Sequence, residues 1–133
     1  MGSFTYRFAF VLSTGKVAGM MNDSMTAIAE QVVAATISEL PPQVRERIAA
    51  VPVLIEDVPA EDDLALGIDA DTLGFFDEDL LGLATIRLWI ANIAAFADAE
   101  GVDFRAEVRT TLLHEIGHVL GWDEEDLDER GLG

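Results

Sequence analysis

The chain contains no cysteine among its 133 residues. This absence excludes disulfide bonds, thiolate metal ligands and a cysteine nucleophile, and it fits a reducing compartment. No apolar run approaches the roughly 20 residues of a membrane-spanning helix, and the apolar stretch Phe8–Leu12 is shorter than the about 7–15 residues of a signal-peptide core. We therefore expect a soluble, cytoplasmic protein.

Basic residues are scarce. The chain has 8 Lys and Arg against 25 Asp and Glu, which gives a formal net charge of −17. Such a surface repels phosphate backbones and anionic lipid headgroups, so neither nucleic acid nor a membrane is expected as a partner. The acids cluster at Glu61–Asp63, Asp77–Asp79 and Asp123–Glu129, where solvated loops and helix faces explain them. A preference for basic substrates is the alternative, which no other feature of the sequence supports.

Half of the residues are hydrophobic, enough for one domain over residues 1–133 with a core of its own. Alternating apolar residues predict strands at Phe4–Leu12, Val51–Asp57, Leu73–Phe76 and Ala84–Ile90. Helical spacing, proline and glycine predict helices at Ser24–Leu40, Gln43–Ala49, Asn92–Ala99, Phe104–Leu120 and about Asp123–Arg130. The first helix is expected to bury Ile28, Val32, Ala35 (or Thr36) and Leu40. Helices around a few strands, without a regular βαβ repeat, indicate an α+β fold.

The helix Phe104–Leu120 carries the motif His114-Glu115-Ile116-Gly117-His118. Residues four apart leave the same face of a helix, so His114 and His118 are placed to bind one tetrahedral zinc ion. Glu115 is placed to reach a zinc-activated water and accept its proton as general base. This is the H-E-x-x-H pattern. The alternative is an exposed His–Glu–His surface without metal, but both histidines of the chain fall within the motif.

A catalytic zinc ion usually has a third protein ligand and one open position. Gly121 allows the chain to reverse just after the second histidine, and the spacing H-E-x-x-H-x-x-G-x-x-E puts Glu124 in the third position. Asp123 is the rival ligand, although it is also placed to cap a following helix.

Several segments besides the motif resemble the family of small, minimal zincin-like proteins of bacteria, which are regarded as zinc metallopeptidases. They are Glu39–Pro42 with Arg45–Arg47, the strand Val53–Asp57, Gly74–Phe76, Ile86–Leu88, Glu107–Leu113 and the acidic tail Asp123–Leu127. The resemblance covers roughly residues 24–133 and leaves 1–22 as an N-terminal extension.

This resemblance implies one compact zincin-like domain, in which a small mixed sheet packs on helices that include the motif helix. It also implies zinc held by His114, His118 and an acidic residue at position 124, with Glu115 as base. The family commonly has aspartate at that position, so Glu124 departs in side-chain length and Asp123 stays open as the third ligand.

Two functions follow from these residues. The first is a zinc-dependent metallopeptidase that acts on a peptide or protein substrate. The alternative is a zinc-binding module with a structural or partner-binding role and little turnover. Peptidases also need a donor for the developing oxyanion. Arg87, Arg109 and Arg130 are candidates by charge, although the many acids favour ordinary ion pairs for each. We expect Ala84–Ile90 to be an edge strand that pairs with an extended substrate.

Overall fold

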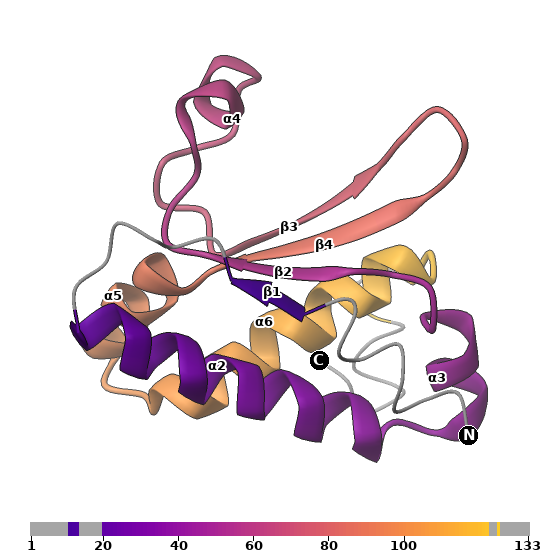
Figure 1. The fold of residues 1–133 in the computed structure, drawn as a ribbon, viewed down its shortest axis with the longest axis horizontal. Coiled ribbons are helices and arrows are strands. Elements are labelled where there is room, and N and C mark those ends of the chain that lie inside the picture. The colour runs from indigo at the N-terminus through magenta and orange to yellow at the C-terminus, as the bar shows by residue number, and fades with distance from the viewer. Residues whose placement is uncertain (1–10, 14–19, 123–124, 126–133) are drawn as a thin grey trace.

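A four-stranded mixed sheet lies against three longer helices in the computed structural model, which describes residues 11–13, 20–122 and 125 (Figure 1). The elements, in chain order, are β1 (Val11–Ser13), α2 (Met20–Glu39), α3 (Pro42–Arg47), β2 (Val53–Glu56), α4 (Glu61–Ala65), β3 (Gly74–Glu78), β4 (Ala84–Trp89), α5 (Ile90–Glu100) and α6 (Phe104–Val119). Helices α2, α5 and α6 cover one face of the sheet, and α4 projects outward on the opposite side of the sheet. The predicted α+β class is confirmed.

The strand order is β1-β2-β4-β3. Strands β1, β2 and β4 run parallel, and β3 pairs antiparallel with β4 through a hairpin. Ile86 of β4 lies opposite Val53 of β2 on one side and Phe76 of β3 on the other. The prediction that Ala84–Ile90 forms an edge strand is therefore wrong. Strand β4 has a neighbour on each side, and the edge strands of the described sheet are β1 and β3.

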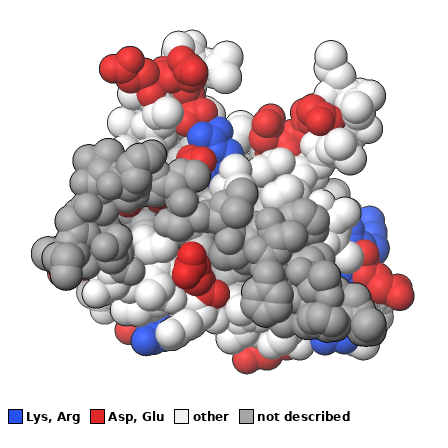
Figure 2. Space-filling model, viewed as in Figure 1, with Lys and Arg blue, Asp and Glu red and all other residues white. Residues whose placement is uncertain are grey.

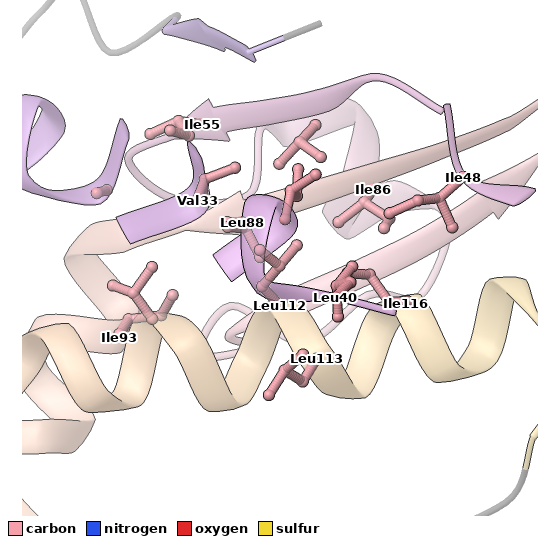
Figure 3. Close-up of a cluster of buried hydrophobic side chains, with 14 of the residues drawn as sticks. Val33, Leu40, Ile48, Ile55, Ile86, Leu88, Ile93, Leu112, Leu113 and Ile116 are labelled. Carbon is pink, nitrogen blue, oxygen red and sulfur yellow. The ribbon is translucent and has the colours of Figure 1, made fainter. Parts of the chain in front are cut away.

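The core lies between the sheet and α6. Ile86 and Leu88 of β4 point toward Leu112 and Ile116 of α6 (Figure 3), and all four are at most 1% exposed. Ile55 of β2 extends the same layer and is fully buried. Because successive strand residues point to opposite faces, this layer fixes which residues of β4 face away from the helices.

The buried face of α2 matches the predicted one only in part, since Thr36 and Leu40 are buried as expected. Ile28 and Val32 are only partly buried, and Ala35 is exposed. The buried residues of α2 and its end are Ala29, Val33, Thr36, Ile37 and Leu40. Two neighbouring apolar rows run along this helix, and helical spacing alone does not decide which row faces the sheet. The helix also begins at Met20, four residues before the predicted start at Ser24.

The helix boundaries follow the residues that favour helix ends. Pro41 and Pro42 start α3, where the fixed φ of proline suits the first turn. Gly101 ends α5 with a φ of 71°, and the Asp103 side chain accepts a hydrogen bond from the Ala106 amide at 3.0 Å to start α6. These boundaries confirm the predicted helices at Gln43–Ala49, Asn92–Ala99 and Phe104–Leu120 to within two residues at every end.

Helix α4 was not predicted, because its residues belong to an acidic cluster that the sequence places in solvent. Figure 2 shows acidic side chains over α4 and over the β3–β4 hairpin. Glu61 and Asp62 are exposed, as expected, but Asp63 is only 6% exposed. Its carboxylate accepts hydrogen bonds from the Ala60 amide at 2.8 Å and from the Arg87 guanidinium at 2.6 and 2.8 Å. A tertiary ion pair thus links this short helix to strand β4.

Two predicted elements lie largely outside the described residues: the strand Phe4–Leu12, of which only Val11 and Leu12 are described, and the final helix Asp123–Arg130, of which only Glu125 is. Within the part that the structure describes, no helix is both long and apolar enough to cross a membrane.

Candidate metal centre

Helix α6 brings the three motif residues together. The His114 and His118 rings lie on one side of the helix, with centroids 4.8 Å apart and planes at 81°. His114 is partly buried and His118 is exposed, whereas Glu115 is only 8% exposed. Two imidazoles are therefore adjacent at the surface, with a buried carboxyl group beside them.

Burial has a direct effect on Glu115. Desolvation penalises the charged form of a carboxyl group, and it raises the pKa of Glu115 to about 7. Strand β3 contributes to this burial, because its first residue, Gly74, lies directly against α6. A Cβ atom at position 74 would meet the Cγ2 of Thr111 at 2.8 Å and the Cγ of Glu115 at 3.3 Å. Glycine thus allows the edge strand to approach the motif helix.

The two histidines fit a zinc site. Their nitrogen atoms are ligands that zinc prefers, and the i, i+4 spacing and the close ring packing put both on one side of α6. Among the residues that the structure describes, no third His, Asp or Glu joins them in a metal-binding group. The predicted third ligand, Glu124, and its rival, Asp123, lie outside the described residues.

The chain does reverse after the second histidine, as the sequence predicts. Gly121 has a φ of 79°, which residues other than glycine rarely adopt. The Gly121 amide donates to the carbonyl of His118 at 3.0 Å, and the Trp122 amide donates to that of Gly117 at 2.8 Å. This pair of hydrogen bonds is the Schellman motif, which ends a helix and turns the chain back.

Two of the three arginines considered as oxyanion donors, Arg87 and Arg109, form ion pairs. Arg87 contacts Glu56 at 3.0 Å and Asp63 at 2.6 Å, and these carboxylates raise the pKa of its guanidinium. Its neighbours in β4 face the core and α6, so the Arg87 side chain lies on the opposite face of the sheet. Arg109 contacts Glu39 at 3.6 Å, and Arg130 lies outside the described residues.

A cavity of about 270 Å³ opens beside the motif. Its lining residues are Leu73, Gly74, Glu107, Thr110, Thr111, His114 and Glu115. Only the last two were predicted from the sequence as site residues. A signal for Glu107 and Thr111 was present, since positions 107, 111, 114 and 118 share one helical face. No local signal identifies Leu73 and Gly74, because the pairing of β3 with β4 brings them to the site.

The fold and the site define a small α+β domain with an H-E-x-x-H helix packed under a mixed sheet. The family model described as zincin-like metallopeptidase matches residues 48–133, more than half of the chain. The chain therefore belongs to the zincin-like metallopeptidase family, which confirms the resemblance found in the sequence. Membership implies zinc binding in general. A comparison with curated proteins finds no match.

Proposed function

We propose that this protein is a zinc-dependent metallopeptidase that hydrolyses peptide bonds. His114, His118 and Glu124, with Asp123 as the alternative third ligand, hold the metal, and Glu115 is the general base. The observation that carries the proposal is the buried Glu115 carboxyl group beside two adjacent imidazoles at one cavity. When bound, zinc lowers the pKa of a coordinated water and polarises the substrate carbonyl.

Glu115 is suited to the transfer of protons. A general base works best when its pKa lies near the working pH, and burial brings the pKa of Glu115 to about 7 in the metal-free chain. In its ionised form the carboxylate accepts the proton of the attacking water. It then returns that proton to the leaving amine, whose nitrogen must be protonated for the peptide bond to break.

Strand β3 is suited to align a substrate. It pairs only with β4 in the described sheet, so its outer edge presents free amides and carbonyls, and its first residue lines the cavity with Glu115. An extended peptide binds such an edge as an added strand. This role falls to β3 rather than to Ala84–Ile90.

The replacement Glu115→Gln tests the function. The amide has nearly the same shape but accepts no proton, so the variant should retain zinc and lose hydrolysis by about 10²–10⁴-fold. We would incubate zinc-loaded wild type and variant with a peptide library and identify products by mass spectrometry. His114→Ala/His118→Ala, which should lose both zinc and cleavage, is the control. Equal cleavage by wild type and Glu115→Gln would refute the assignment and indicate a contaminating protease.

A zinc-binding module with little turnover is the second candidate. One observation favours it: within the described chain, the cavity lining includes no arginine, no tyrosine and no histidine other than His114, so it supplies no obvious oxyanion donor. Zinc-loaded wild type that cleaves no peptide of the library would support this candidate and leave the metal site intact.

A further inference from the structure

The cavity beside the motif extends well beyond the metal-binding residues. His114 and Glu115 lie at one end, and Glu107 lies two helical turns earlier on α6. Seven residues at 1.5 Å per residue place Glu107 about 10 Å from His114 along the helix axis. The distance leaves room for a substrate side chain between the reacting bond and the Glu107 carboxyl group.

Two neighbouring polar groups line this cavity, and neither has a cationic partner among the described residues. No Lys or Arg forms an ion pair with Glu107 among the described residues, and burial raises the pKa of its carboxyl group. Thr111, one turn later, is 6% exposed, and its hydroxyl has no hydrogen-bond partner in the described structure. The hydroxyl is still close enough to offset part of the pKa increase at Glu107. The Thr111 hydroxyl is thus directed to Glu107, whose carboxyl group still has no cationic partner among the described residues.

The electrostatic surroundings favour a cation. A second cavity, of about 570 Å³, shares Leu73 with the first, and Asp69 and Asp71 line it. No Lys or Arg lines either cavity within the described chain. Carboxylate and hydroxyl oxygens accept hydrogen bonds from guanidinium and ammonium groups. The negative charge of the two cavities therefore attracts basic side chains of a ligand and repels acidic ones.

We propose that Glu107 and Thr111 form a subsite for an arginine or lysine side chain of the peptide substrate. Glu107 binds the cationic group, and Thr111 holds the Glu107 carboxylate toward the cavity. This inference rests on the proposed function and adds a substrate class to it. It also gives one of the many acidic residues, Glu107, a specific role in substrate binding.

A purely structural role for Glu107 makes a different prediction. Glu107 lies in the first turn of α6, where a carboxylate stabilises the positive end of the helix dipole. That role alone would make Glu107→Gln less stable but would not change which ligands bind. A ligand preference is the measurement that separates the two roles.

The test is a binding experiment that requires neither zinc nor hydrolysis. We would titrate the metal-free full chain with N-acetyl-arginine methylamide and N-acetyl-norleucine methylamide, following chemical shifts by NMR. The wild type should bind the arginine amide at least about tenfold more tightly, the ratio that one charge-assisted hydrogen bond supplies. Glu107→Gln should remove this preference. The control Glu100→Gln, an exposed carboxylate outside both cavities, should keep it.

A second pair of variants covers the case in which Glu107→Gln folds poorly. Thr111→Val removes the hydroxyl and should reduce the arginine preference several-fold, whereas Thr111→Ser retains the hydroxyl and should preserve it. A wild type that binds both amides equally, or neither, contradicts the subsite, and so does an unchanged preference in Glu107→Gln. Loss of zinc binding or of hydrolysis would instead count against the proposed function alone.

Discussion

Asp63 illustrates how one residue of an acidic run acquires a structural role. Its two neighbours in sequence, Glu61 and Asp62, are exposed, but its own carboxylate is bound by Arg87 and by the Ala60 amide. The hydrogen bonds from Arg87 are the main cause of its lowered pKa. Arg87 also lies 5.1 Å from the Trp89 ring centroid, so the pair links α4 to the outer face of the sheet.

The lowered pKa predicts how stability depends on pH. A carboxyl group whose pKa is lower in the folded state stabilises the fold above its unfolded value, here 3.8, and this contribution is lost as the pH falls through the folded value. Asp63→Asn should therefore reduce the free energy of unfolding by about 1–3 kcal/mol at pH 7, less if solvent screens the partly exposed Arg87. Below pH 3.8 the difference from wild type should shrink.

Urea denaturation at pH 7 and at several pH values below 4 measures this dependence. Asp62→Asn is the matched control, because Asp62 is exposed, and it should change the free energy of unfolding little at any pH. An equal loss for Asp63→Asn at pH 7 and at the acidic end would show that shape, rather than charge, explains the effect.

At the scale of elements, the contact between β3 and α6 determines the shape of the site. Gly74→Ala would place a Cβ atom 2.8 Å from the Thr111 Cγ2 and 3.3 Å from the backbone oxygen of Arg87. Because the backbone of β4 cannot yield easily, β3 must move away from α6. We expect a loss of about 1–3 kcal/mol in the free energy of unfolding, as for other overpacked contacts.

Thr111→Ser provides the partner for a double-mutant cycle, because it removes the methyl group that the new Cβ would meet. The double variant should recover part of the stability that Gly74→Ala loses, giving a coupling energy of about 0.5–3 kcal/mol. Urea denaturation of the four proteins measures it. Strictly additive losses would mean that the methyl group of Thr111 does not limit the approach of β3.

The sequence predicts those elements whose ends are determined locally. Pro42, Gly101, Asp103 and Gly121 each impose a backbone or hydrogen-bonding condition on their own neighbourhood, and the helices begin or end at these residues. Helix α4 was not predicted because it has no row of apolar residues. It is held by the hydrogen bond between Asp63 and Arg87, which are 24 residues apart in the sequence. The order of the strands could not be predicted either. The alternation of apolar and polar residues defines the two faces of a strand but does not show which strands pair with it.

The candidate site also has one part that the local sequence predicts and one part that it does not. His114, Glu115 and His118 follow from the spacing within one helix, and the structure places them together. The opposite wall of the cavity, Leu73 and Gly74, lies some 40 residues earlier in the chain. It reaches the motif only through sheet pairing, which the local pattern does not encode.

At the scale of the whole molecule, the net charge of −17 affects any metal measurement. The large excess of acidic side chains attracts divalent cations to the surface, so zinc associates weakly even without a specific site. A test of the metal centre must separate this background from binding at the two histidines. Variants that keep the acidic surface but lose individual ligands serve this purpose.

We predict that the chain binds about one zinc ion through His114 and His118. After reconstitution at neutral pH and desalting, elemental analysis should find this zinc in the wild type but not in His114→Ala/His118→Ala. Metal that binds only the folded state stabilises it by about 2.7 kcal/mol at 100 times its Kd, on the order of 10 °C in Tm for a domain of this size. Glu124→Ala should weaken binding more than Asp123→Ala, because Asp123 is better placed to cap a following helix. Equal losses, or a larger loss for Asp123→Ala, would reverse the third-ligand assignment, and equal zinc in wild type and the double histidine variant would refute the metal centre.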